Sequence, residues 1–269
     1  MTIATLVRAG LAIALLAAGV WAAPAAGAVT PPPAGAPFDY QIGGAYPPAP
    51  GVGIVDRDRT AAPAAGAYNV CYINAFQTQP GAARWWKAKH RDLLLRRNGK
   101  YVTDSAWNEM LLDPSTAAKR RALAAIVGRW IDGCRRAGYQ AIEPDNLDAW
   151  TRSQHQLTMA DTKAYASLLI RRAHAAGLAI AQKNGAELGS AGQALGFDFA
   201  IAEECNVYDE CGSYTAPFGD RVYEIEYTDN GGPANFQAAC AARGASISII
   251  YRDRDVVPMG APGYTYDAC

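Results

Sequence analysis

One phrase recurs four times in the second half of this chain: a helical pattern ends at a glycine, a strand pattern follows, and the strand ends in polar residues. The four copies read RRAGYQAIEPDN, HAAGLAIAQKN, QALGFDFAIAEE and AARGASISIIYRD, around Gly138, Gly177, Gly196 and Gly244. Glycine just past a helix adopts the left-handed conformation that a helix-to-strand connection favours. Strands that alternate with helices predict a parallel sheet.

Further strand patterns precede these copies and follow them. The eight candidate strands are residues 40–44, 53–56, 69–73, 140–145, 178–183, 198–203, 221–226 and 246–251. Eight strands in a body of roughly 230 residues predict an α/β fold, a single-domain (β/α)8 TIM-type barrel. The alternative is a doubly wound open sheet, which would need a phosphate-binding glycine loop or another switch-point signal, and no G-x-G-x-x-G or Walker sequence occurs.

Two helix starts can be predicted from capping residues. Asp113-Pro114 precedes an apolar pattern at helical spacing (Leu123, Ile126, Val127, Trp130, Ile131 and Cys134), which suggests a cap followed by proline in the first turn. Thr158 with Asp161 predicts a capping box for the next helix. Between the third and fourth strands, residues 76–113 form a long insertion with three tryptophans, Trp85, Trp86 and Trp107, which suit either a sugar-stacking wall or core packing.

The first 28 residues resemble a secretory signal peptide. Arg8 supplies the positive charge, residues 11–23 are apolar but too short to span a bilayer, and Ala26-Gly27-Ala28 fits a cleavage site. We therefore expect a secreted, extracellular protein without membrane attachment after cleavage. Residues 29–37 form a Pro/Ala-rich leader, expected to be flexible or polyproline-like and outside the core, and residues 38–269 form the domain.

Six cysteines in an exported chain predict three disulfides. Fifteen pairings are possible. The spacing favours a small Cys205–Cys211 loop and a Cys240–Cys269 link to the C-terminus, which leaves Cys71 with Cys134. A zinc site is the alternative, but the sequence has no C-x-x-C and its three histidines lie far from the cysteines.

The net charge of the chain excludes a polyanion as an obvious partner. Lysine plus arginine and aspartate plus glutamate number 25 each. Nothing therefore suggests nucleic acid binding, and the function must reside in a local site. We expect a monomer.

In a barrel, the active site lies at the C-terminal ends of the strands. The seventh residue after each repeated glycine is Asp145, Asn184, Glu203 or Tyr251. Asp145 and Glu203 thus occupy equivalent positions two strands apart, with their backbones about 9 to 10 Å apart. Inward-leaning carboxyls at that separation can flank a glycosidic bond, which requires about 5 to 9.5 Å depending on mechanism.

Acids at strand ends also suit a structural role or a metal site. A single acid at a strand end is more often a helix cap, an ion-pair partner or a solvated loop residue than a catalyst. Asp56, Asp58, Glu143 and Asp145 could instead hold Ca²⁺ or Mg²⁺, although no contiguous ligand loop is present. We expect no metal and no cofactor.

Several sequence runs resemble the endo-alpha-1,4-polygalactosaminidase family of glycoside hydrolases. The matching runs are YQIGG, VDRD, CYIN, W-x-E-x-x-L-D from Trp107, GYQAIEPDNLD, AQKN, EEC-x(5)-C and EIEY. They extend over nearly the whole mature chain. The most specific are EPDN-x-D and E-x-C-x(5)-C.

The resemblance implies a barrel enzyme that cuts internal bonds of galactosamine polysaccharides with Asp145 and Glu203 as its catalytic carboxylates. The remaining substrate-binding or supporting candidates are Asp58, Tyr72, Asn74, Glu143, Asp148, Lys183, Asn184 and Glu226. We favour Asp145 as nucleophile and Glu203 as acid/base, but the sequence leaves retention and inversion open. The alternatives are a non-catalytic carbohydrate-binding barrel and a glycosidase of another extracellular polymer.

Overall fold

The computed structural model of the protein describes Met1 and residues 29–269. The predicted signal peptide therefore lies outside the described residues, apart from Met1, and stays a prediction. Within the described part of the chain, no helix is both long and apolar enough to cross a membrane.

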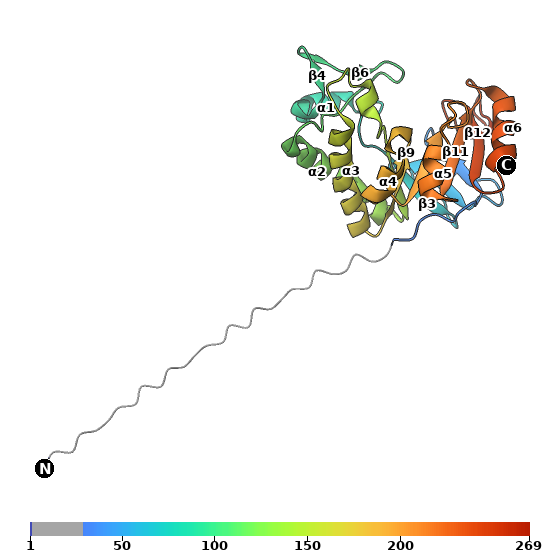
Figure 1. The fold of residues 1–269 in the computed structure, drawn as a ribbon, viewed down its shortest axis with the longest axis horizontal. Coiled ribbons are helices and arrows are strands. Elements are labelled where there is room, and N and C mark those ends of the chain that lie inside the picture. Colours follow the sequence, from blue (N-terminus) through green and yellow to red (C-terminus); the bar gives the residue numbers. More distant parts are fainter. Residues whose placement is uncertain (2–28) are drawn as a thin grey trace.

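A curled nine-stranded sheet forms the centre of the molecule, as Figure 1 shows. Its eight parallel strands follow one another in chain order. They are β1 (Phe38–Tyr40), β2 (Ile54–Asp58), β3 (Tyr68–Asn74), β8 (Ala141–Asp145), β9 (Ala179–Lys183), β10 (Phe199–Glu203), β11 (Val222–Tyr227) and β12 (Ser248–Arg252). A short ninth strand, β13 (Tyr266–Ala268), pairs antiparallel with β12.

The curled sheet brings β12 close to β1. Ser248 donates a hydrogen bond to the Ala36 carbonyl just before β1, at 2.5 Å, and Arg252 donates to the Tyr40 carbonyl. From β13, Tyr266 donates to the Phe38 carbonyl at 2.8 Å. The predicted TIM-type barrel is therefore confirmed, with a side-chain seam where its first and last parallel strands meet.

Helices cover only part of the sheet. They are α1 (Ala83–Lys89), α2 (Ala117–Ala137), α3 (Met159–Ala175), α4 (Ser190–Leu195), α5 (Gly212–Phe218) and α6 (Gly232–Arg243), with 3₁₀ turns at Arg91–Leu93, Ala149–Arg152 and Ala186–Leu188. Helices α2 and α3 pack together on one side, whereas α6 covers β11 and β12 on the other (Figure 1). The connections from β1 to β2 and from β2 to β3 contain no helix.

The insertion after β3 carries α1 and two small hairpins. Their strands are β4 (Arg96–Arg97), β5 (Lys100–Tyr101), β6 (Thr103–Asp104) and β7 (Glu109–Met110). Trp86 is buried and packs edge-on against Trp130 of α2, whereas Trp107 is exposed in the β6–β7 turn. Core packing is therefore the role of Trp86, and sugar stacking stays a prediction for Trp107.

Each strand has one face inside the barrel and one under the helices, because successive side chains alternate. The inner face carries an apolar cluster near the bottom of the barrel, and the outer face packs against α2, α3 and α6. The inner cluster includes Phe38, Ile54, Val70, Ala141, Ala179, Ala181, Phe199, Ile201, Tyr223, Ile225 and Ile250. On the inner face, buried charged residues such as Asp56, Glu143 and Lys183 lie from the middle of the strands to their C-terminal ends.

Two predicted boundaries are wrong. The first strand ends at Tyr40, and the predicted continuation to Gly44 is a turn, in which a Cβ on Gly43 would lie 2.5 Å from the Val256 carbonyl. Helix α2 begins at Ala117, capped by Thr116, so Asp113-Pro114 does not start it. The first strand ends early because of a long-range contact between its predicted end and Val256. The helix begins later because Thr116 is a cap closer to its apolar pattern.

The capping box of α3 is confirmed, because Thr158 and Asp161 exchange both hydrogen bonds. The expected leader, residues 29–37, contacts the sheet. The Tyr68 hydroxyl donates to the Thr30 carbonyl at 2.7 Å, and the Tyr223 hydroxyl donates to the Pro33 carbonyl at 2.9 Å. The boundary at residue 38 stays a prediction.

All three disulfides form with the pairing that the spacing favoured. Cys71–Cys134 joins β3 to α2, Cys205–Cys211 closes the loop after β10, and Cys240–Cys269 ties the C-terminus to α6. Their sulfurs are bonded to one another, so they leave no thiolate for the alternative zinc site. Three disulfides are consistent with an oxidising compartment.

Candidate active site

A cleft of about 950 Å³ opens at the C-terminal ends of the parallel strands. Strand alternation points Asp145 of β8, Lys183 of β9 and Glu203 of β10 into it. The insertion contributes Trp107 and Glu109 to the same wall. One site thus combines residues from strands and loops that are distant in sequence.

Lys183 lies between the two predicted catalytic acids. Its Nζ atom is 3.4 Å from Asp145 Oδ1 and 3.4 Å from Glu203 Oε2. These two oxygens are therefore at most twice that distance apart, about 6.8 Å. That bound lies inside the range in which a carboxylate pair can flank a glycosidic bond.

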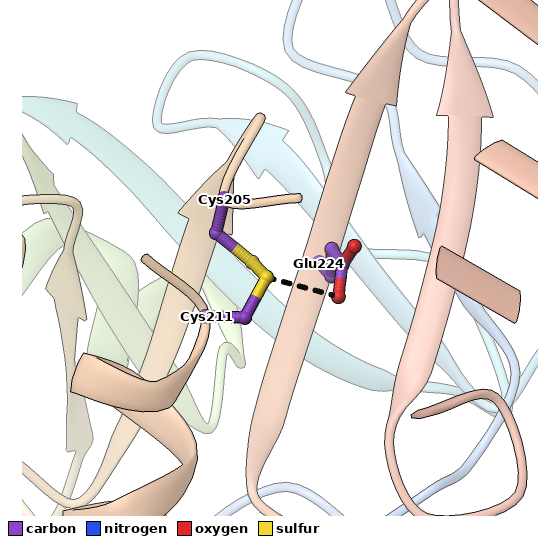
Figure 2. Close-up of side chains that lie close together, drawn as sticks. All are labelled: Cys205, Cys211 and Glu224. Carbon is purple, nitrogen blue, oxygen red and sulfur yellow. Dashed lines mark hydrogen bonds between the residues drawn. A yellow bond between two sulfur atoms is a disulfide. The ribbon is translucent and has the colours of Figure 1, made fainter. Parts of the chain in front are cut away.

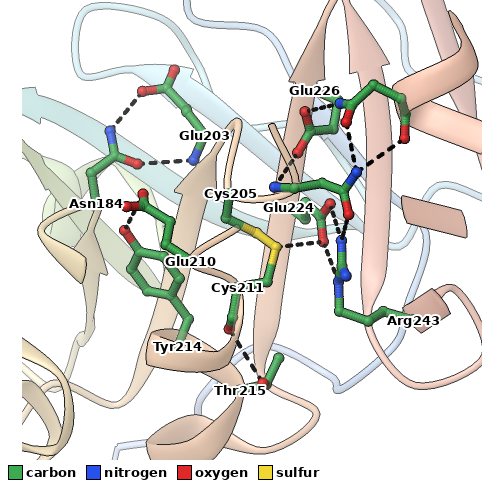
Figure 3. The surroundings of a disulfide bond; sticks show 12 residues. Asn184, Glu203, Cys205, Glu210, Cys211, Tyr214, Thr215, Glu224, Glu226 and Arg243 are labelled. Carbon is green, nitrogen blue, oxygen red and sulfur yellow. Dashed lines mark hydrogen bonds and ion pairs between the residues drawn. A yellow bond between two sulfur atoms is a disulfide. The ribbon is translucent and has the colours of Figure 1, made fainter. Parts of the chain in front are cut away.

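Each acid is fixed by its own hydrogen-bond donors. Asp145 Oδ2 accepts from the Tyr72 hydroxyl at 2.7 Å. Glu203 Oε1 accepts from the Tyr227 hydroxyl at 2.5 Å, and its Oε2 accepts from the Asn184 amide at 2.8 Å. Figure 3 shows the Asn184–Glu203 pair, in which the Glu203 backbone N–H also donates to the Asn184 side chain. Both carboxylates are held in fixed orientations.

The residue after each inward side chain has a left-handed backbone. Asn146, Asn184 and Glu204 have φ angles of 63°, 50° and 60°. Asparagine tolerates this conformation, but for glutamate it is uncommon. Arg254 holds Glu204 there by donating to both of its carboxylate oxygens, at 3.0 and 2.5 Å. The chain therefore turns away abruptly at the barrel mouth and leaves Asp145, Lys183 and Glu203 facing the cleft.

Electrostatics separate the protonation states of these groups. Burial opposes ionisation of Asp145, but the Lys183 ammonium and the Tyr72 hydrogen bond lower its pKa below the ordinary value. Burial also opposes the charge of Lys183, yet the surrounding carboxylates raise its pKa well above the ordinary value. Asp145 is thus an anion and Lys183 a cation at neutral pH.

A second acid layer lies beneath the cleft. Glu143 and Asp56 are wholly buried. Glu143 Oε1 accepts from Tyr40 at 3.0 Å and from Lys183 at 2.5 Å. Burial raises the pKa of both acids, and that of Asp56 rises well above its ordinary value. Burial likewise raises the pKa of the phenols Tyr40, Tyr72 and Tyr227, which therefore remain hydrogen-bond donors.

Most of the predicted site residues meet in this cleft. Seven of the predicted residues line it: Asp58, Tyr72, Asp145, Asp148, Lys183, Asn184 and Glu203. Asn74 and Glu143 lie directly behind the wall, where Asn74 links Glu109 to Asn146.

Glu226 lies elsewhere. It is on the outer face of β11, where it accepts hydrogen bonds from the Asn206 backbone and the Asn235 amide (Figure 3). Its neighbour Tyr227 is the inward residue, because adjacent strand residues face opposite sides.

The counting rule from the repeated glycines fails for the fourth copy. Gly244 has a φ of −58° and is not a left-handed cap, and β12 begins only at Ser248. Tyr251 consequently points outward and stacks on Phe236 at 5.2 Å, whereas Arg252 faces inward. In the second copy, the inward residue of the strand is Lys183, one position before Asn184.

Sequence reasoning missed several residues of the site. They are Tyr40 and Glu109, and, at strand ends, Asn146, Tyr227 and Arg254. Glu109 is nearly buried, and burial raises its pKa to about 7. Asn146 carries a usable signal, since asparagine directly after a strand acid suits a left-handed turn. Glu109 belongs to the W-x-E-x-x-L-D run, but it reaches the cleft only through the fold of the insertion.

The metal alternatives find little support in the geometry. Among the described residues, only Cys205, Cys211 and Glu224 are grouped closely enough for a metal, and Figure 2 shows that the two sulfurs form a disulfide. In the Asp56–Asp145 acid cluster, the Lys183 ammonium lies where the calcium alternative would place a cation.

Comparisons with known proteins agree with this architecture. The structure is similar to that of Aspergillus fumigatus Ega3 in complex with galactosamine, with a TM-score of 0.72 and 22% identity over 90% of this chain and 98% of that one. It is also similar to the glycoside hydrolase domain of PelA from Pseudomonas aeruginosa, with a TM-score of 0.58 and 14% identity over 84% and 96% of the two chains. The comparison with curated proteins found no match.

The family comparison covers nearly the whole chain. The family model described as "Glycoside-hydrolase family GH114" matches residues 19–269. The match includes every strand of the barrel and every side chain of the cleft. The chain is therefore a glycoside hydrolase and belongs to family GH114.

Proposed function

We propose that this protein is a secreted enzyme that hydrolyses internal alpha-1,4 bonds of a galactosamine-containing polysaccharide, with Asp145 and Glu203 as its catalytic pair. The observation that carries the proposal is the shared position of the two carboxylates, each 3.4 Å from one lysine in an open cleft. The galactosamine bound by Ega3 supports the choice of sugar. The disulfides and the signal-like N-terminus support secretion.

The charge of the cleft supports a cationic substrate. The chain as a whole has a formal net charge of zero. Seven acids and three bases line the cleft, a formal charge of −4: Asp58, Asp104, Glu109, Asp145, Asp148, Glu203 and Asp255 against Arg152, Lys183 and Arg254. Protonated amino groups of galactosamine units would be attracted to this surface. An uncharged polysaccharide gains nothing from it.

The two acids would have different roles in the reaction. Asp145 is ionised because Lys183 and Tyr72 lower its pKa, so it suits the nucleophile that attacks the anomeric carbon. Glu203 would give its proton to the departing glycosidic oxygen and later take one from the water that releases the glycosyl-enzyme. The bound of about 6.8 Å between their oxygens favours this retaining arrangement over the wider inverting one.

The test is an assay of new reducing ends on a partially deacetylated galactosamine polymer. Asp145→Asn and Glu203→Gln should each lower kcat by at least about a thousandfold, since a nucleophile or an acid/base is lost. Asp220→Asn, at an exposed position before β11, is the matched control and should retain wild-type activity.

Two outcomes would overturn the proposal. Equal activity of wild type and Asp145→Asn would show that Asp145 is not a catalytic residue. Binding of the polymer without any new reducing ends would indicate a carbohydrate-binding barrel. Activity on other glycans in a panel, but none on the galactosamine polymer, would assign another substrate.

A further inference from the structure

The floor of the cleft contains two carboxyl groups with too few partners. Asp56 of β2 is wholly buried, and neither of its oxygens has a hydrogen-bond partner among the described residues when both are treated as acceptors. Glu143 Oε2 is in the same condition. Asp56 of β2 and Glu143 of β8 are on the strands that flank β3, and a hydrogen bond between the two side chains contributes to the pKa shift of each. Two acceptors that meet in a dry interior require a proton between them.

We propose that Asp56 is a positioning residue that stays protonated and donates its proton to Glu143 Oε2, which keeps Glu143 ionised as the anchor of Lys183. The functional part rests on the proposed catalytic pair, because Lys183 acts on Asp145 and Glu203. The protonation of Asp56 itself does not depend on the identity of the substrate.

The hydrogen bonds decide which acid holds the proton. Glu143 Oε1 already accepts from Lys183 and Tyr40, so ionised Glu143 with a proton from Asp56 would accept three hydrogen bonds. Asp56 has no such donors. An ionised Asp56 would be an isolated buried charge, the costliest state for a carboxyl group.

The charge of the surroundings leads to the same assignment. Lys183 is the only cation in contact with the acid pair among the described residues, and it already faces Glu143, Asp145 and Glu203. A further anion beside it would be unpaired. The titratable groups around Asp56 come from several strands and the turn before β8: Tyr40, Tyr72, Tyr139, Glu143, Asp145, Lys183 and Glu203.

This arrangement gives Asp56 a role in catalysis through two intermediates. Ionised Glu143 holds the Lys183 ammonium 2.5 Å from its Oε1 and so fixes the cation between the two upper acids. Without the proton of Asp56, Glu143 itself would take up a proton and release Lys183. The charge near Asp145 and Glu203 would then change, although Asp56 does not contact substrate.

Two substitutions distinguish a neutral Asp56 from a charged one. Asp56→Asn keeps the shape and a donor toward Glu143, so it should retain kcat within about twofold and leave the pH profile unchanged. Asp56→Leu keeps the branched shape, with larger methyl groups in place of the oxygens, but removes the donor. It should lower kcat roughly tenfold, the loss of one hydrogen bond to a charged group, with KM unchanged and a shifted pH profile.

Infrared spectroscopy reads the proton without any substrate. At about pH 9, Glu109 and Glu226, which titrate at about 7, are ionised, so a remaining protonated-carboxyl band should come from Asp56. The band should be present in the wild type and absent from Asp56→Asn. In Asp56→Leu, where Glu143 takes up a proton, a protonated-carboxyl band should remain, now from Glu143. Thermal unfolding of each variant checks that it is folded.

Two results would refute the proposal: no protonated-carboxyl band in the wild type, or equal losses of activity in Asp56→Asn and Asp56→Leu. The first result would show that Asp56 carries no proton. The second would show that its hydrogen-bond donor does not matter for activity. If the wild type has the band but cleaves no galactosamine polymer, the proposed function fails and the assignment of the proton to Asp56 stands.

Discussion

Lys183 is the residue on which the charges of the site depend. It is almost wholly buried and contacts three carboxylates that would otherwise repel one another. A buried ion pair is weak evidence for stability, but removal of one partner is expensive because the remaining charge is left unpaired. The lysine therefore serves both the fold and the ionisation of Asp145.

The Lys183→Met variant tests this dual role. Because the folded-state pKa of Asp145 is lowered, its ionisation stabilises the fold above its unfolded pKa, and this contribution is lost as pH falls through the folded pKa. Without the ammonium, the acid limb of kcat/KM should move up by about one pH unit or more. Urea unfolding should report a loss of about 3–5 kcal/mol. An unchanged acid limb would show that Lys183 does not set the charge of Asp145.

The raised pKa of Glu109 predicts a pH dependence of stability that has the opposite sign to that of Asp145. Burial raises its pKa from 4.5 to about 7, so the folded state binds this proton more tightly than the unfolded chain does. The group therefore costs stability as pH rises through that window, by up to about 3 kcal/mol.

The Glu109→Gln variant should lack this cost. Its unfolding free energy relative to wild type should rise between pH 4.5 and pH 7, measured by urea denaturation at each pH. Glu226, which also titrates at about 7, is present in both proteins, so its contribution cancels. A difference that does not vary with pH would contradict the raised pKa.

At the scale of elements, the insertion after β3 has one tryptophan in the core and one at the cleft. Trp86 is 1% exposed and packs in the core, whereas Trp107 is 52% exposed and lines the cleft. Trp86→Ala should lower the unfolding free energy by about 3–5 kcal/mol. Trp107→Ala should leave stability unchanged and raise KM roughly two- to tenfold, the worth of one aromatic contact.

Paired thermal unfolding and kinetic measurements on the two variants check this division. Each variant is the control for the other, since both remove the same side chain from the same insertion. A stability loss in Trp107→Ala comparable with that in Trp86→Ala would reject a binding role for Trp107.

The strands were predictable because each carries its own signal of apolar residues between turn residues. All eight parallel strands overlap their predicted positions, and the strand count indicated the barrel. It was harder to predict which face of the sheet each residue is on. Glu226 and Tyr251 lie one position away from the inward residue, and a shift of one residue reverses the face.

The side-chain contacts between strands could not be predicted from the sequence. Asp56 and Glu143 meet only because β2 and β8 flank β3, and Glu109 reaches the cleft only through the hairpins of the insertion. Asp145 and Glu203 could be identified because they end equivalent strands. The sequence thus indicated the acids at strand ends, but not the lysine position between them or the acid layer beneath.

At the scale of the whole molecule, a neutral chain with an acidic cleft predicts salt-dependent binding of a cationic substrate. The catalytically inactive Asp145→Asn variant should bind a galactosamine oligomer more weakly as salt rises from about 0.01 M to about 1 M, because the Debye length falls from about 30 Å to about 3 Å. We expect the Kd to rise roughly tenfold or more.

The fully N-acetylated oligomer of the same length is the matched control, since it carries no charge and its Kd should stay nearly constant. If both Kd values respond alike, or neither responds, the negative charge around the cleft does not select the substrate. Recognition would then have to come from uncharged contacts such as Trp107 and Asn184.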